Sequence, residues 1–262
     1  MLLEKEDDIK IYYETYGKKG NTPIVLIHGL GCDHNMYQPQ IEKYTKKGYY
    51  LITPDMRGHG KSSKVKTLTL TDWTEDIYDL IEHLDLNKVV LLGISMGGVI
   101  AQKFITRYPE KVRKLILSDT FAELKSITEK FAGISQVLSF KFFKYLPNKF
   151  AASMFASAYK DFSDEVYDYF KKVTLAADFR QLELARKAIN KIDVLDELKQ
   201  VSIPVLVLVG NKADIMIKPA EKIVDKLKNV DFKIIEDALD PSNMTNTEVF
   251  DKYVLEFLKR DR

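Results

Sequence analysis

The stretch VVLLGISMGGV, at positions 89–99, decides the fold. Its first part, Val89–Leu92, predicts a buried strand, and the residues after the stretch predict a helix. Ser95 therefore lies on the turn between them, with Gly93 two residues before it and Gly97 two residues after it. A strand that turns directly into a helix brings two backbones together, so the flanking positions can carry no side chain. The spacing predicts a strained turn that exposes the serine hydroxyl above a sheet.

The rest of the chain alternates strand-like and helix-like segments. The expected strands are short, apolar or β-branched, and bounded by turn residues. They are residues 9–16, 23–27, 49–53, 88–92, 112–117, 204–209 and 231–235. The expected helices are residues 35–47, 71–86, 96–108, 219–227 and 247–259. Short apolar strands separated by helices indicate an α/β protein with a mostly parallel, doubly wound sheet covered on both faces.

The alternation stops between about Phe121 and Ile192. This stretch contains no strand-like run bounded by turns, and it is helical in pattern and rich in aromatic residues. A helical insertion between two halves of one sheet accounts for it most simply. We therefore predict a first part of the core at residues 1–120, a helical cap at residues 121–192 after the sixth strand, and a second part of the core at residues 193–262.

The amino-acid composition indicates which classes of binding partner are not expected. The 262 residues carry 40 basic and 38 acidic side chains, with a net charge of +2, so no polyanion-binding surface and no nucleic acid are expected. The amino terminus lacks a signal-like apolar core, and no apolar run is long enough to span a bilayer. Cys32 stands alone, so we expect no intrachain disulfide, no membrane association and a cytoplasmic location.

Cofactor and metal sites are not expected either. The run GHGKSS contains Gly-Lys-Ser, but a phosphate-binding loop needs a glycine five residues before Gly60, and that residue is Asp55. GISMGG likewise lacks dinucleotide-binding spacing. Scattered histidines and carboxylates show no metal-ligand spacing.

Three motifs resemble the α/β-hydrolase family, and the resemblance covers nearly the whole chain. HGLG at His28–Gly31 is similar to the family's loop after the third strand, and DMRGHGKS at Asp55–Ser62 to its loop after the fourth. The turn at Gly93–Gly97 is similar to the family's nucleophile elbow. The resemblance implies Ser95 as the nucleophile. The amide of Met96, at the start of a helix, would bind a developing oxyanion together with that of Leu30.

Other roles follow from the same resemblance. His28, Gly29 and His34 would border the substrate pocket. Aromatic residues of the predicted cap would line an apolar acyl pocket or pack the cap onto the sheet. Those aromatic residues are Phe131, Phe140, Phe142, Phe143, Phe150 and Phe155.

The catalytic acid has two candidates. The family's acid lies just after the strand that follows the cap, which corresponds to Val205–Val209. Asp214 follows Gly210 by four residues, one more than is usual in the family, and is the expected acid. Asp119, at the end of the preceding strand, is the alternative.

The catalytic base is missing, because no histidine follows His83. The family's histidine lies in a Gly-His pair some ten residues before an aromatic residue of the last helix. Counting back ten from Phe250 reaches Asp240, with Leu239 in the glycine's place. An aspartate with an ordinary pKa of about 3.9 is a poor acceptor for a serine proton. Beside a second carboxylate, one of the two tends to hold a proton.

Two functions are compatible with this pattern. One is a small-molecule serine hydrolase that cleaves apolar carboxylic esters through an acyl-serine and is impaired at its base. Loss of a triad base lowers turnover roughly a millionfold and leaves on the order of a thousandfold over water. The alternative is a non-catalytic relative, natural or engineered, that binds a small apolar ligand or a partner. Either is expected to be a monomer or a homodimer.

Overall fold

The protein is built around an eight-stranded sheet, which the computed structural model describes within residues 1–5, 8–212 and 214–260, with Asp214 described for its backbone alone. The strand order is β1-β2-β4-β3-β5-β6-β7-β8. The pairs β1–β2 and β2–β4 are antiparallel, and all other neighbours are parallel. The predicted mostly parallel α/β sheet is confirmed. The strands are β1 (Leu2–Glu4), β2 (Lys10–Tyr16), β3 (Thr22–Ile27), β4 (Tyr49–Pro54), β5 (Val89–Ile94), β6 (Val112–Ser118), β7 (Val205–Gly210) and β8 (Val230–Ile235).

Helices cover both faces of the sheet. One face packs against α1 (Gln38–Lys46) and α10 (Thr247–Lys259). The other packs against α2 (Leu70–His83), α3 (Met96–Arg107) and α8 (Ile217–Val224). Successive side chains of a strand point to opposite faces. In β5, Val90 and Leu92 accordingly join the first of these cores, while Val89 and Leu91 join the second.

One strand was not predicted, and several helix boundaries, among them the start of α2, differ from the sequence-based expectation. The short strand β1 was not predicted, because three residues followed by charged ones carry no readable alternation. Helix α2 begins at Leu70 rather than at Thr71. Its N-cap is Thr69, whose hydroxyl accepts from the amide of Asp72, while the carboxylate of Asp72 accepts from the amide of Thr69. This reciprocal capping box satisfies two amides at the helix start and so fixes where the helix begins.

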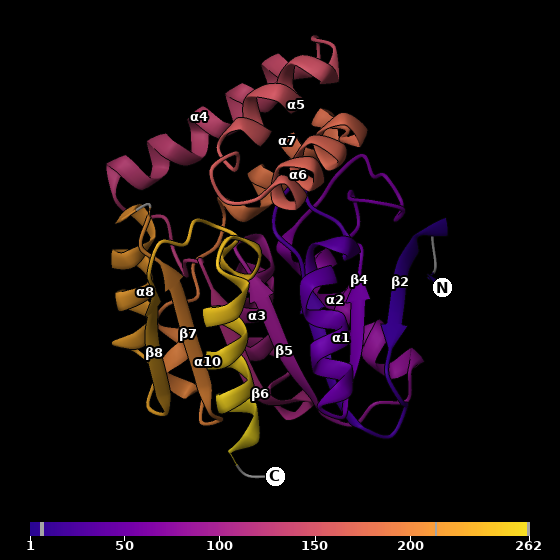
Figure 1. Cartoon of the computed structure of the whole chain (residues 1–262), viewed down its shortest axis with the longest axis vertical. Helices are drawn as coiled ribbons and strands as arrows, with labels where there is room; N and C mark the ends of the chain where they lie inside the picture. The colour runs from indigo at the N-terminus through magenta and orange to yellow at the C-terminus, as the bar shows by residue number, and fades with distance from the viewer. Residues whose placement is uncertain (6–7, 213, 261–262) are drawn as a thin grey trace.

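Four helices between β6 and β7 form a separate layer at one end of the sheet, at the top of Figure 1. They are α4 (Ile127–Phe143), α5 (Asn148–Ser157), α6 (Asp164–Ala176) and α7 (Phe179–Ile189). A small apolar cluster containing Phe143, Ala151 and Phe179 joins α4, α5 and α7. This helical layer and the end of the sheet enclose the cavity described below. None of the described helices has the length and apolar character that crossing a bilayer requires.

Candidate active site

Ser95 occupies a strained turn between β5 and α3. Its φ of 54° lies in the left-handed region, which a residue with a side chain adopts at a cost. A Cβ on Gly93 would lie 2.2 Å from the carbonyl oxygen of Gly97, and a Cβ on Gly97 would lie 1.9 Å from that of Ile27. Both glycines are therefore required by contact with backbone, and the tight packing holds the serine in its strained conformation.

Neighbouring backbone and side chains hold this turn. The amide of Ser95 donates to the carbonyl oxygen of Ser118 at 2.9 Å, and the hydroxyl of Thr120 donates to the carbonyl oxygen of Ser95 at 2.9 Å. A Cβ built on Gly29 would lie 3.6 Å from the Ser95 Cβ, so this loop also packs against the serine. The position of the hydroxyl is thus fixed from the ends of β3 and β6 as well as from β5.

Met96 and Leu30, the residues expected to supply the oxyanion amides, line the same cavity as Ser95. Met96 is the first residue of α3, and the first amides of a helix have no acceptor within it. Leu30 lies in the loop after β3, and both residues line the same cavity as Ser95. A helix start carries partial positive charge, so an oxyanion formed next to Ser95 would be stabilised there.

Asp240 reaches the serine from the loop before α9 (Ser242–Thr245). Asp240 lines the same cavity as Ser95, and its contact with the serine side chain acts on its pKa. Burial, together with the negative charge of Asp119, raises the pKa of Asp240 to about 8, although the contact with Ser95 acts in the opposite direction. Asp240 is therefore largely a neutral carboxylic acid at pH 7.

Asp119 lies behind Asp240, just after the end of β6. It is 1% exposed and adopts a φ of 51°. Its carboxylate accepts hydrogen bonds from the amides of Gly210 and Ser242, both at 2.9 Å, and from the hydroxyl of Ser118 at 3.1 Å. Its negative charge is one of the causes that raise the pKa of Asp240.

The other candidate, Asp214, begins a short 3-10 helix, Asp214–Met216, and its side chain lies outside the described part of the structure. A third contributor was not predicted: the hydroxyl of Tyr159 donates to the carbonyl oxygen of Asp240 at 2.8 Å and ties the helical layer to this loop. A single tyrosine in an aromatic-rich segment gave no sequence signal for that role.

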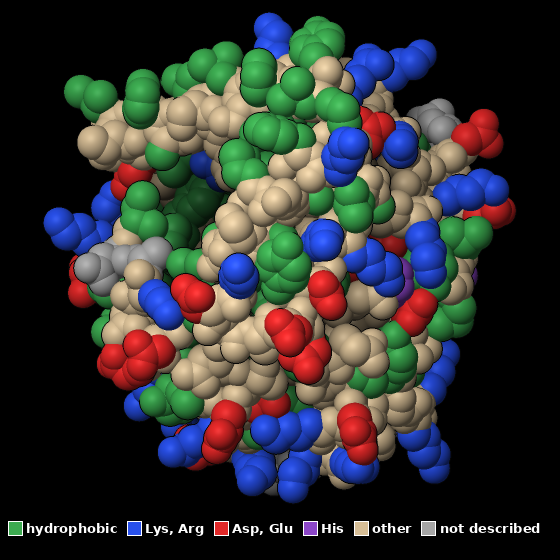
Figure 2. Space-filling view, turned by 45° about the horizontal axis from the view of Figure 1, so that its top comes forward, with side chains coloured by type: hydrophobic (Ala, Val, Ile, Leu, Met, Phe, Trp, Pro, Cys, Tyr) green, Lys and Arg blue, Asp and Glu red, His purple; other side chains and the backbone are tan. Residues whose placement is uncertain are grey.

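The cavity above Ser95 has a volume of about 710 Å³. Its walls come from the helical layer and from the ends of β5 and β6, and Figure 2 shows a hollow with hydrophobic side chains around it. Of the aromatic residues expected to line it, Phe140, Phe143 and Phe155 do so. The remaining three, Phe131, Phe142 and Phe150, are instead more than half exposed on the outer surface of α4 and α5.

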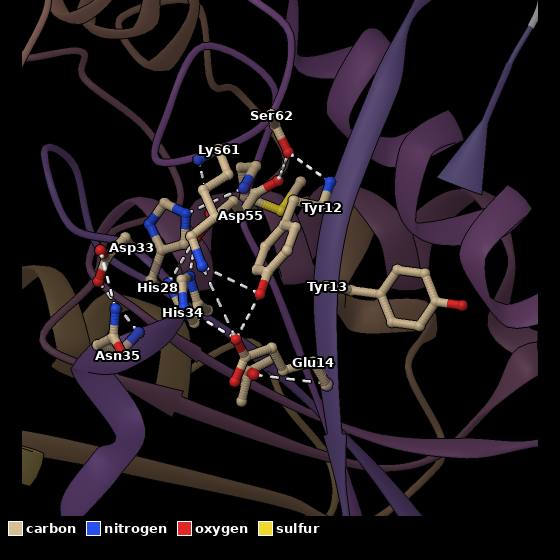
Figure 3. A network of polar contacts seen from close by, with 12 residues as sticks. Tyr12, Tyr13, Glu14, His28, Asp33, His34, Asn35, Asp55, Lys61 and Ser62 are labelled. Atoms are coloured by element: carbon tan, nitrogen blue, oxygen red, sulfur yellow. Dashed lines mark hydrogen bonds and ion pairs between the residues drawn. The ribbon is translucent and has the colours of Figure 1, made fainter. Parts of the chain in front are cut away.

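The three residues expected to border the pocket, His28, Gly29 and His34, are not among those that line it. His28 is fully buried, and its Nε2 accepts from the amide of Met56 at 3.0 Å. His34 lies between two carboxylates (Figure 3). The expectation was wrong because a buried carboxylate, that of Asp55, draws His34 beneath the loop rather than toward the cavity.

Asp55 organises that buried network. Its carboxylate accepts from the backbone amide of His34 at 2.6 Å, from the His34 ring at 2.9 Å and from the amide of Lys61 at 2.8 Å. Burial opposes a charge on His34, but the hydrogen bond and charge of Asp55, helped by the charge of Glu14, outweigh it and raise the His34 pKa. The network joins β2 to the loops that carry the site (Figure 3).

No imidazole lines the cavity, and all four histidines belong to the described part of the chain. Burial lowers the pKa of His59 to about 3, so this ring is neutral and lies away from Ser95. His83 is exposed at the end of α2, beside the hydroxyl of Tyr13. The group next to the serine is thus a carboxyl group. Within the described residues, no cluster of histidine, cysteine and carboxylate side chains is arranged to hold a metal ion.

Comparisons with known proteins show the family and the fold of the chain. A family model described as "Serine aminopeptidase, S33" matches residues 19–239. The 3-oxoadipate enol-lactonase 2 of Acinetobacter baylyi is 24% identical over 255 residues, which span 97% of this chain and 94% of that protein. A thermophilic esterase from Thermogutta terrifontis is 25% identical, with a TM-score of 0.87 over 99% of this chain and 98% of its own. The enol-lactonase from Burkholderia xenovorans, at 22% identity, shares the fold with a TM-score of 0.86 over 97% of this chain and 98% of its own. The chain belongs to the α/β-hydrolase family that this "Serine aminopeptidase, S33" model describes.

Proposed function

We propose that this α/β hydrolase cleaves small, largely apolar carboxylic esters through an acyl intermediate on Ser95. The observation that carries the proposal is the position of the serine: a strained turn presents it to a cavity of about 710 Å³, beside the amides of Met96 and Leu30. Strain of this kind is kept where the surroundings enforce it and is concentrated at functional sites.

The chemical steps follow from these positions. The Ser95 oxygen attacks the ester carbonyl carbon, and its proton passes to the carboxylate of Asp240. The negative charge on the carbonyl oxygen is stabilised by the amides of Met96 and Leu30. Collapse of the tetrahedral intermediate expels the alcohol, which takes the proton from Asp240. Water then attacks the acyl-serine in the same way and releases the carboxylic acid.

Asp240 is the weak component of this machinery. An ordinary aspartate would be far too acidic to accept the serine proton, but a pKa of about 8 brings this carboxylate close to the range of a general base. The same shift leaves only about one molecule in ten ionised at pH 7. Hydrolysis is therefore expected to be slow at neutral pH and faster in alkaline solution.

The nearby relatives support an ester-cleaving role. The thermophilic esterase and the enol-lactonases carry names that imply attack on the carbonyl of an ester or of a cyclic ester. Both reactions need a nucleophile, an oxyanion site and a largely apolar pocket, and residues suited to each part line one cavity here. We extend the proposal to small lactones, and to the helical layer acting as a cap over the bound acyl group.

A second candidate is a binding protein without turnover, favoured by the carboxyl group that stands where an imidazole is usual in the family. In that case Ser95 would occupy the cavity floor without being activated. The cavity would then hold a small apolar ligand or segment of a partner.

The test uses p-nitrophenyl butyrate hydrolysis and fluorophosphonate labelling at pH 8.5. We expect Ser95→Ala to reduce hydrolysis to the background rate and to abolish labelling. The matched control is Ser157→Ala, which removes an exposed hydroxyl at the end of α5 and should change neither. Equal hydrolysis by Ser95→Ala and the unmodified protein would exclude Ser95 as the nucleophile. Binding of the ester without labelling or hydrolysis would support the second candidate instead.

A further inference from the structure

Arg186 is a charged residue on the inner side of α7. It lines the cavity together with Leu182, four residues before it, and Ile189, three residues after it. Positions separated by three or four residues share one face of a helix. Leu182 and Ile189 are 6% and 1% exposed. The guanidinium is thus placed on an apolar, buried helix face rather than on the solvent side.

The guanidinium has no counter-ion among the side chains that the structure describes. Among the described residues, no carboxylate forms an ion pair with it, and its Nε atom is buried without a hydrogen-bond partner. The guanidinium carbon Cζ lies 5.7 Å from the centroid of the Phe121 ring, over which it is placed. Burial lowers the pKa of Arg186 to about 10, which still leaves it charged at neutral pH.

Three described carboxyl groups share the cavity wall: burial and the charge of Asp119 raise the pKa of Asp240, and the other two are paired with lysines. Glu129 accepts from the amide of Ser126 in the cap of α4 and pairs with Lys222 at 3.0 Å. Glu123 pairs with Lys125 at 2.9 Å and with Lys222 at 3.3 Å. Both glutamates are thus paired with lysines, and within the described part of the chain Arg186 forms no ion pair.

The position of Arg186 relates it to the nucleophile. Phe121, the ring under the guanidinium, directly follows Thr120, and the hydroxyl of Thr120 donates to the carbonyl oxygen of Ser95 at 2.9 Å. Both the guanidinium and the serine border the same cavity. A ligand can therefore contact both at once, with its intervening atoms against the apolar walls.

We propose that Arg186 binds a carboxylate of the substrate, so that the preferred substrates are carboxylate-bearing esters such as monoesters of short dicarboxylic acids. This inference rests on the proposed function of Ser95. A guanidinium offers a planar fork of donors that matches a carboxylate, and such charge-assisted hydrogen bonds are strong where water is excluded. Burying a cation without a partner is unfavourable, and a bound anion supplies the missing partner.

The apolar walls define the remainder of the ligand. Most of the side chains that line the cavity are hydrocarbon or aromatic. A short methylene chain in the ligand would pack against these apolar walls. A second charged group between the two ends of the ligand would have no ion-pair partner there. Monoethyl glutarate carries an ester and a carboxylate separated by three methylene groups. Ethyl valerate has the same chain length with a methyl group in place of the carboxylate.

Binding is measured first, without catalysis. Isothermal titration calorimetry at pH 7 and low salt compares the two esters on the Ser95→Ala protein. We expect monoethyl glutarate to bind at least tenfold more tightly than ethyl valerate. Adding Arg186→Gln should abolish that preference, and adding Arg186→Lys should retain part of it. The control is Arg180→Gln, which removes a charge from the exposed side of the same helix and should leave the preference intact.

The outcomes separate this inference from the proposed function. Equal affinity for the two esters, or a preference that survives Arg186→Gln, would overturn the assignment of Arg186 while leaving hydrolysis by Ser95 untouched. If Ser95 proves not to be the nucleophile, the calorimetric preference still decides the role of Arg186. Thermal melting provides a further readout. Arg186→Gln removes an unpaired buried charge and should not lower the melting temperature, whereas a large loss would assign the guanidinium a structural role instead.

Discussion

Asp240 and Ser95 line the same cavity, and the contact between them acts on the pKa of the Asp240 carboxyl group. Burial and the charge of Asp119 raise its pKa to about 8, so the same contact joins the serine to a neutral acid in neutral solution and to a carboxylate in alkaline solution. The consequences of this protonation can be measured in both activity and stability.

The rate of ester hydrolysis should depend on the ionisation of Asp240. We predict that kcat/KM for p-nitrophenyl butyrate, corrected for the spontaneous rate, rises about tenfold between pH 7 and pH 9 and levels off above the pKa. Asp240→Asn should remove this step because an amide does not titrate. Asp119→Asn should move the midpoint to lower pH because it removes the repelling charge. A profile whose midpoint lies near 8 in the Asp240→Asn protein would assign the step to another group.

Asp240 should also make the folded protein less stable as the pH rises. Its pKa of about 8 in the folded state exceeds the ordinary value of about 3.9, so the folded protein holds a proton that the unfolded chain releases. Stability linked to this group is therefore greatest below pH 4 and declines up to about pH 8. We predict that Asp240→Asn raises the free energy of unfolding by roughly 1–4 kcal/mol at pH 8 and much less at pH 4. Urea denaturation of both proteins at the two pH values measures this, and an unchanged difference across the range contradicts the raised pKa.

The elbow should not tolerate a methyl group at Gly97. A Cβ there would lie 1.9 Å from the carbonyl oxygen of Ile27, which belongs to a central strand and has little room to move. We predict that Gly97→Ala costs about 3 kcal/mol or more and abolishes labelling of Ser95. Gly48→Ala is the control. That glycine also has a positive φ, 78°, but open space around it, so strain alone should cost about 1 kcal/mol. Similar losses in the two variants would show that the contact with Ile27 is not the cause.

The buried network under the site should make a large contribution to stability. We predict that Asp55→Asn lowers the free energy of unfolding by about 3 kcal/mol, because it breaks a fully buried charged contact with His34. The raised pKa of His34 means that its stabilisation is present below its ordinary pKa and is lost as the pH rises through the folded value. The loss should therefore be larger at pH 5.5 than at pH 8.5. The control is Asp33→Asn, in the loop that also carries His34. It should lower the free energy of unfolding by less than about 1 kcal/mol, because asparagine also caps a turn. A loss at Asp55 that does not vary with pH would argue against a charged His34.

The fold could be predicted from local pattern, because each decisive feature lies within a few residues. The glycines around Ser95 and the apolar run of β5 are read directly from the chain, as is the return of strands at Val205–Gly210. The position of Asp240 followed from counting back along the last loop. Strand β1 was not predicted because three residues are too few to show an alternation of apolar and polar side chains.

The details of the site depend on contacts between distant segments, which the sequence does not display. The position of Asp119 depends on hydrogen bonds from Gly210 and Ser242, which are 91 and 123 residues away in the chain. His34 was expected at the pocket rim because the burial of Asp55, 21 residues later, has no local signal. The unusual position of Arg186 is visible in the sequence, because the residue lies between Leu182 and Ile189 on the apolar face of a helix. The sequence shows that a charged residue lies on this face, but it does not show whether that residue has an ion-pair partner.

The most direct measurement is hydrolysis of p-nitrophenyl butyrate at pH 7.5 by the unmodified protein and by the variant Leu239→Gly with Asp240→His. An imidazole at this position would lie between Ser95 and the carboxylate of Asp119, and a positioned base contributes roughly 10²–10⁴-fold. The result expected is a gain of about a hundredfold or more that disappears when Ser95→Ala or Asp119→Asn is added. A variant that folds normally but hydrolyses the ester no faster than the parent would mean that the proton of Ser95 is accepted elsewhere.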